Sequence, residues 1–159
     1  MNKTKIIGLF VASSFIFSCN PQKKIAGNYE HKTECLGVEG DGSQTVKAWG
    51  MGKNRADAIE QARKNAVKDV LFKGVSYGKP CCEVKPLVLE VNAQQKYEDY
   101  FNVFFQDSGM YRNFVTNKDE SFWSKEKLGA GTEVSMGVIM RVLRVDLKKK
   151  LLQDNILKP

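Results

Sequence analysis

The stretch KNRADAIEQARKNAVKDVLFK, residues Lys53–Lys73, carries the strongest local signal in the sequence. Its apolar side chains recur every three or four residues, the spacing that lines one face of a helix. Asn54 is placed to cap the first turn, with Asp57 three positions later, and Gly74 supplies a stop. Because most of the apolar residues are small, the sequence predicts a helix that lies close on a sheet. The predicted face comprises Ala58, Ile59, Ala62, Ala66, Val67, Val70 and Leu71.

Two short strand-like runs precede this helix. TECLGVE, residues 33–39, and QTVKAWG, residues 44–50, are separated by GDGS, residues 40–43. The glycines of the connection allow the positive φ angles that a tight turn needs. The two runs are therefore predicted to form a hairpin.

Gly50 and Gly52 stand between the second run and the helix, which invites comparison with nucleotide-binding loops. A dinucleotide fingerprint requires a third glycine where Arg55 stands, and a Walker A loop ends in a Gly-Lys-Ser/Thr sequence that is absent here. Since neither pattern is met, the two glycines are expected to let the chain reverse direction and pack closely against the helix.

An aromatic segment follows, NAQQKYEDYFNVFFQD, residues 92–107. Its aromatic residues lie at helical spacing, so a second helix is predicted. The aromatic face either fills the core or, if it is exposed, forms a partner surface with the anchors typical of interface hot spots. The candidate partner surface comprises Tyr97, Tyr100, Phe101 and Phe104.

The C-terminal third supplies further elements. Residues 110–115 are predicted as a short strand, and residues 132–145 alternate between apolar and other side chains, which predicts a long strand. Asp146 is placed to cap a terminal helix. Strands and helices thus occur in mixed order, which predicts a single α+β domain over residues 33–159, with helices packed on a largely antiparallel sheet.

Three of these segments, TVKAWGMG, ADAIEQARKNAVKDVL and EVSMGVIMRVLRVDL, together resemble a known domain. They are similar to the amino-terminal domain of flagellar assembly protein T and of a group of small envelope lipoproteins that share it. The resemblance implies an α+β fold and a non-catalytic envelope or assembly component. It implies no cofactor and offers no catalytic residues to transfer.

The first 18 residues have the pattern of an export signal. Two lysines precede the uncharged run Ile6–Phe17, which is shorter than the roughly 20 residues that a membrane-crossing helix needs. Ser18 and Cys19 resemble the end of the signal in bacterial lipoproteins, in which the cysteine becomes the first residue and is acylated. We expect residues 1–18 to be removed and lipid to be attached at Cys19. The alternative is an ordinary signal peptide that is cut elsewhere.

Residues 19–32 mix proline, glycine, asparagine and lysine without apolar periodicity, so they are expected to form a tether. Several acyl chains on Cys19 give a stable anchor in the bilayer. No acidic cluster follows Cys19, and the expected location is the outer membrane of a bacterial envelope, facing the periplasm. The expected partners are the lipid bilayer and an unidentified envelope protein. The export signal argues against nucleic acid despite the net charge of +7.

Three further cysteines, Cys35, Cys81 and Cys82, would enter an oxidising compartment. One disulfide is expected from Cys35 to either Cys81 or Cys82, and the remaining thiol is buried, pairs with a partner or is reactive. The alternative is a zinc site that adds His31. However, adjacent cysteines rarely both reach one metal, and structural zinc sites space them as C-x2-4-C. Neither a metal site nor a cofactor is therefore expected.

Few residues in the sequence are candidates for catalysis. The only histidine, His31, lies at the end of the expected tether, and the paired carboxylates Glu98 and Asp99 are expected on a solvated helix face. No catalytic residue is assigned, and the sequence favours a membrane-anchored binding or assembly component. Two rival functions remain open, a wall-active or thiol-dependent envelope enzyme and a small-ligand binder lined by the aromatic helix.

Overall fold

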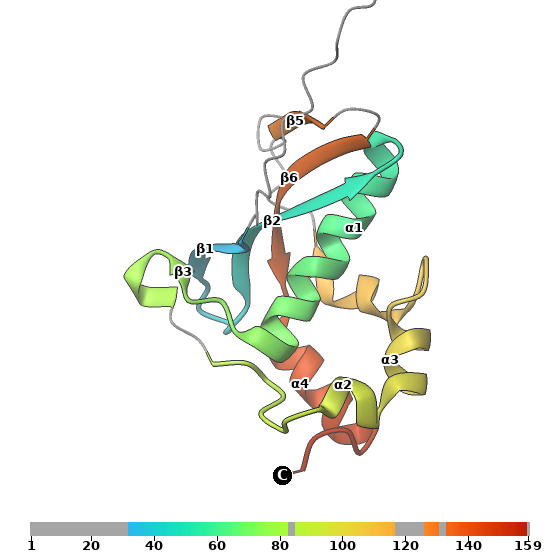
Figure 1. Ribbon diagram of the computed structural model, residues 1–159. Coiled ribbons are helices and arrows are strands. Elements are labelled where there is room, and N and C mark those ends of the chain that lie inside the picture. The colour runs from blue at the N-terminus through green and yellow to red at the C-terminus, as the bar shows by residue number, and fades with distance from the viewer. Residues whose placement is uncertain (1–31, 83–84, 117–125, 131–132, 159) are drawn as a thin grey trace, which may run out of the picture.

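The computed structural model describes residues 32–82, 85–116, 126–130 and 133–158 (Figure 1). The predicted export signal, Cys19, His31 and nearly all of the predicted tether lie outside the described residues. The strands are β1 (Glu34–Val38), β2 (Gln44–Gly52), β3 (Tyr77–Gly78), β4 (Val115–Thr116), β5 (Glu126–Ala130) and β6 (Glu133–Val142). The α-helices are α1 (Arg55–Lys68), α2 (Ala93–Lys96), α3 (Glu98–Phe104) and α4 (Arg144–Gln153). Shorter helical turns are η1 (Asp69–Lys73), η2 (Pro80–Cys82) and η3 (Met110–Phe114).

The strands form one sheet in the order β3-β1-β2-β6-β4, and β5 also pairs with β6. The described pairs are antiparallel except that β1 and β3 run parallel. At the centre, β2 pairs with β6 from Gln44 opposite Val142 to Gly52 opposite Val134. Figure 1 shows α1 lying along one face of the sheet, with α2, α3 and α4 gathered near the C-terminal end of α1. The predicted α+β fold with helices on a largely antiparallel sheet is confirmed.

Helix α1 begins where the sequence predicts. The side-chain oxygen of Asn54 accepts a hydrogen bond from the backbone N–H of Asp57 at 3.0 Å, which satisfies one of the free donors of the first turn. At the other end, η1 continues α1 as a wider π-helical turn. Gly74 ends it with a φ of 74°, a conformation that glycine adopts without strain.

Gly50 and Gly52 bring the backbones of β2 and α1 into direct contact. A Cβ atom on Gly50 would overlap backbone atoms of Ala58 and Ala62, and one on Gly52 would overlap Asp57 and the backbone of Ala58. The buried alanines of α1 complete this close approach, because a larger side chain would push the helix away from the sheet. The packing role predicted for the two glycines is confirmed.

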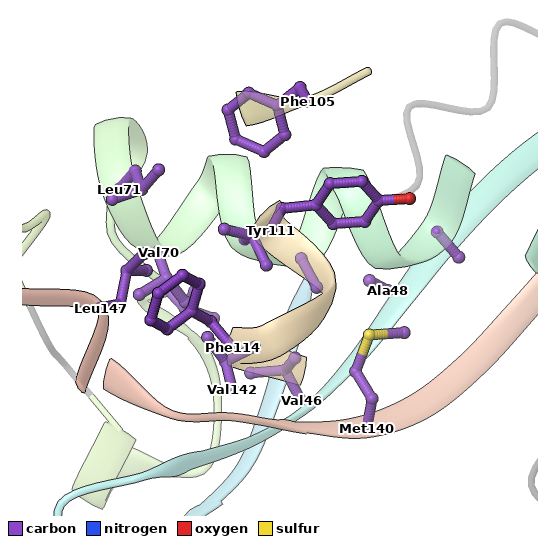
Figure 2. Close-up of a cluster of buried hydrophobic side chains, with 14 of the residues drawn as sticks. Val46, Ala48, Val70, Leu71, Phe105, Tyr111, Phe114, Met140, Val142 and Leu147 are labelled. Atoms are coloured by element: carbon purple, nitrogen blue, oxygen red, sulfur yellow. The ribbon is translucent and has the colours of Figure 1, made fainter. Parts of the chain in front are cut away.

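The core lies between α1 and the inner face of the sheet. Alternate residues of β2 and β6 face the helix because successive side chains of a strand point to opposite faces. Figure 2 shows Val46 and Val142 near Val70 and Phe114, with Ala48 and Met140 further along the sheet on the side of Tyr111. The labelled sheet residues of this cluster are Val46, Ala48, Met140 and Val142.

Three local predictions are wrong. Residues 92–107 form two short helices, because Tyr97 leaves helical geometry with φ −114° and ψ 36°. Residues 110–115 are mostly the 3-10 helix η3, whose i,i+3 spacing brings Tyr111 and Phe114 into the core together. The terminal helix begins at Arg144, so Asp146 lies in its first turn and does not cap it.

A disulfide joins Cys35 of β1 to Cys82 of η2, with Cα atoms 5.8 Å apart. Both residues are fully buried. The bond is one of the two pairings that the sequence left open, and the side chain of Cys81 lies outside what the structure describes. The two cysteines are 47 positions apart, so the closed loop contains β2 and α1 entirely.

Replacing Gly50 by alanine is expected to destabilise the fold by about 3 kcal/mol, because backbone on both sides of the new methyl group has to move. Gly37→Ala is the matched control, since a Cβ there meets nothing within 4 Å, and its effect is expected to stay within about 0.5 kcal/mol. Urea unfolding followed by circular dichroism measures both changes. Equal midpoints for the two variants would contradict the close approach.

Replacing Cys82 by alanine is expected to lower the free energy of unfolding by about 4 kcal/mol, the chain-entropy value for a loop of 47 residues. Cys81→Ala is the matched control and is expected to leave the midpoint of unfolding nearly unchanged. Mass spectrometry of unreduced peptides identifies the bond directly. A peptide in which Cys35 is linked to Cys81 would contradict the pairing seen here.

Candidate functional site

A polar groove runs along the exposed side of α1. It consists of three adjoining hollows, with volumes of about 470, 620 and 570 Å³ from the C-terminal end of α1 to its start. The first two share Phe72, Gln94 and Gln95, and the last two share Gln61 and Lys64. We call the three together the α1 groove. Its opposite wall comes from the loop before α2, from α2 and from α3.

The middle hollow has an aromatic floor and a rim of amides. Phe72 meets Phe101 edge to face, with 4.9 Å between the ring centroids. The exposed side chains of Gln94, Gln95 and Asn102 lie on the rim, and none of them has a side-chain hydrogen bond to another described residue. These amides each offer a donor and an acceptor to a ligand.

Most charges of the α1 groove are already paired. Lys64 binds Asp107 at 2.6 Å, and Arg112 binds Glu60 at 2.7 Å. Lys68 differs, because its ammonium lies 5.1 Å from the centre of the Phe105 ring and has no acidic partner within 4 Å in the described part of the chain. The groove therefore offers amides and a single ammonium group without an acidic partner.

At the end near the start of α1, a cluster forms around the carboxylate of Glu60. Nε and Nη2 of Arg112 each lie 2.7 Å from Oε1 of Glu60, and the hydroxyl of Tyr111 donates to the same oxygen. Arg63 lies 3.4 Å from the other carboxylate oxygen. The cluster ties η3 to α1 and closes this end of the groove.

The pKa values in this cluster argue against acid–base chemistry. Burial disfavours ionisation of Glu60, but the hydrogen bonds from Arg112 and Tyr111 outweigh burial and hold the pKa of Glu60 at about 2. Burial, together with the Glu60 carboxylate, raises the pKa of Tyr111 to about 12. Each group thus keeps one protonation state at neutral pH, whereas a general acid or base works best with a pKa near the operating pH. The cluster serves to hold η3 in place.

Of the two alternatives for the aromatic face, packing into the core is confirmed for its two phenylalanines, and the partner surface is wrong for them. Phe101 is 6% exposed and Phe104 is 0% exposed, because an aromatic helical face gains most by packing inward. Tyr97 and Tyr100 are half-buried, and the hydroxyl of Tyr100 donates to Asp154 at 2.7 Å. The four residues therefore do not form one exposed face.

The other predicted site residues fall into two groups. Cys19 and His31 lie outside the described residues, so the lipidation site stays a prediction. Cys35 and Cys82 are bonded to each other, which leaves neither thiolate free for the alternative zinc site. Within the described ranges, no three His, Cys, Asp or Glu side chains gather as a metal would require, and no helix is long and apolar enough to cross a bilayer.

The sequence left open a binding site lined by the aromatic helix, but it did not predict that α1 forms the other wall of the α1 groove. Its two walls lie about 30 positions apart in the chain, so no local pattern links them. The sequence feature that could have indicated the groove is the set of amides at positions 94, 95 and 102, which interrupt an otherwise aromatic helical segment. Amides on the outside of a segment whose aromatic residues pack inward are well placed to line a groove.

No protein-family model, curated protein or solved structure matches this chain. The resemblance to the amino-terminal domain of flagellar assembly protein T therefore stays a prediction.

Because of Glu60, the free energy of unfolding is expected to decrease as the pH falls. The pKa of Glu60 falls from 4.5 to about 2 on folding, so its contribution is complete above pH 4.5 and is lost as the pH falls towards 2. Glu60→Gln is expected to cost about 1–2 kcal/mol at pH 7 and to flatten the acid side of the stability curve. Urea unfolding from pH 7 to pH 2.5 measures this, with Glu98→Gln as the exposed control. An unchanged slope in Glu60→Gln would contradict the assignment.

Proposed function

We propose that this protein is a bacterial lipoprotein, anchored through acylated Cys19, whose α+β domain faces the periplasm and binds other envelope components without catalysing a reaction. The observation that carries this proposal is the buried disulfide between Cys35 and Cys82. Disulfides persist in oxidising compartments and are rare in a reducing cytosol. The bond therefore supports the same destination as the export pattern of residues 1–18.

The α1 groove supports a binding activity. It is open and polar, its rim amides are free to hydrogen bond, and its titratable cluster is fixed in one charge state at neutral pH. Such a site recognises a surface or a chain by shape and hydrogen bonds.

The mechanism that we propose is tethering. An acylated Cys19 confines the domain to a thin layer above the bilayer, which raises its effective concentration for partners in that layer without any added contact. Residues 19–32 supply the length that lets the domain reach them. Because no acidic residues directly follow Cys19, the outer membrane is the proposed destination, with the domain on its periplasmic side.

The anchor is tested by labelling cells with a palmitate analogue and comparing the native protein with Cys19→Ser. The native protein is expected to carry the label and to sediment with membranes. Cys19→Ser is expected to lose the label and to accumulate with a longer, uncleaved leader. Equal labelling of the two forms would contradict anchoring at Cys19.

The binding activity is tested with a photo-reactive amino acid placed at Gln95, on the rim of the α1 groove, or at Lys149, on the exposed side of α4. Crosslinks to envelope components are expected from Gln95, and at least about tenfold fewer from Lys149. Equal yields at the two positions would show that the groove is not the binding face. No crosslinks from Gln95, while a control lipoprotein captures its partner, would overturn the binding proposal.

A further inference from the structure

We infer that the α1 groove binds a short extended polypeptide segment with an aliphatic residue towards one end and a single carboxylate near its middle. This inference rests on the proposed binding function and names the partner class for the same site. Four properties of the groove support it: its length, its amides, the apolar side chains at one end and the charge along its wall.

The length of the groove fits a chain. Its helical wall extends from Ala56 in the last hollow to Phe72 in the first, which corresponds to about 24 Å at 1.5 Å per residue. An extended peptide advances about 3.3 Å per residue, so about seven residues span the groove. The hollows adjoin one another and share wall residues, which suits a continuous strand better than a compact small molecule.

The rim amides match a peptide backbone. An extended segment outside a sheet presents N–H and C=O groups that each need a hydrogen-bond partner. Gln94, Gln95 and Asn102 carry both a donor and an acceptor, and the described residues leave these side chains free. Because backbone groups are the same in every residue, this set of contacts recognises an extended chain without reading its sequence.

Apolar side chains at the first hollow select for an aliphatic residue and favour a peptide over a glycan. Leu89 is 71% exposed and Val91 is 83% exposed, and both line this hollow beside Phe72. Exposed aliphatic groups beside a hollow are typical of protein-binding surfaces. Sugar rings commonly stack on an open aromatic face, but Phe101 and Phe105 in the floor are almost completely buried, and Phe72 is half-buried and packs edge to face against Phe101.

Charge along the wall limits the segment to one carboxylate. Lys68 has no acidic partner in the described part of the chain, and the partner of Lys64 is Asp107, whose side chain is 91% exposed and easily displaced. A ligand carboxylate would therefore find an ammonium group on the α1 wall. Glu98 on the opposite wall opposes a segment that is acidic throughout.

The test uses the purified full-length lipoprotein in detergent micelles and a library of fluorescein-labelled seven-residue peptides. Each peptide has Leu or Val near one end and Asp, Glu, Asn or Gln near its middle. Fluorescence anisotropy is expected to select the aliphatic peptides that carry Asp or Glu. Lys68→Glu and Leu89→Ser are each expected to weaken the best peptide at least about tenfold. Lys149→Glu, the surface control, is expected to change binding less than about twofold, and circular dichroism checks that every variant is folded.

Three results would overturn the inference. The first is that no library peptide binds, and the second is that Lys68→Glu and Leu89→Ser both leave peptide binding unchanged. The third is that soluble peptidoglycan glycan fragments bind in a Lys68-dependent manner while peptides do not, which would make the groove a glycan site. Each of these outcomes leaves the proposed function standing if Cys19 still carries lipid and Gln95 still crosslinks. Loss of those two signals would instead overturn the proposed function itself.

Discussion

The backbone contact between β2 and α1 is the constraint on which the rest of this structure depends. Gly50 and Gly52 remove the side chains that would hold the two elements apart, and Ala58 and Ala62 do the same from the helix. Because the backbones lie so close, small residues of the helix are enough to cover the central strands without leaving voids. The larger apolar residues lie beyond this contact, where η1, η3 and α4 complete the core. The opposite side of α1 is left to face solvent with its lysines, arginines and glutamines, and that side becomes one wall of the groove.

The other wall follows from how the aromatic segment packs. Phe101, Phe104 and Phe105 turn inward, which leaves the nearby amides of Gln94, Gln95 and Asn102 on the outside. The ion pair of Glu60 with Arg112 fixes η3, which follows the aromatic segment, against α1. Before the segment, the backbone N–H groups of Leu87 and Val88 donate to the carbonyls of Val70 and Leu71, so the chain is held on both sides of the segment. The packing of the core therefore determines where the groove lies. The chemistry of the groove comes from the few residues of these segments that stay outside the core.

Much of the fold could be read from the sequence, because its main signals are local. The spacing of alanines predicted α1, alternation predicted β6, and the glycines predicted both the hairpin and the close approach. The failures have tertiary causes. Residues 110–115 resemble a strand locally, but a 3-10 turn lets two aromatic rings reach the core. A site lined by the aromatic segment was left open, but its second wall on α1 was not foreseen, because the two walls meet only when the aromatic segment has packed. Nor does spacing decide which of two adjacent cysteines pairs with Cys35.

The disulfide between Cys35 and Cys82 also determines how the molecule carries mechanical load. A pull applied to the chain on the N-terminal side of β1 reaches Cys35 and passes through the covalent bridge directly to Cys82. The backbone from residue 36 to residue 81, which includes β2 and α1, is therefore excluded from the line of tension. While the bond is oxidised, stretching cannot unravel this ring. The helix wall of the groove is thus protected from such a force, and reduction of a single bond abolishes that protection.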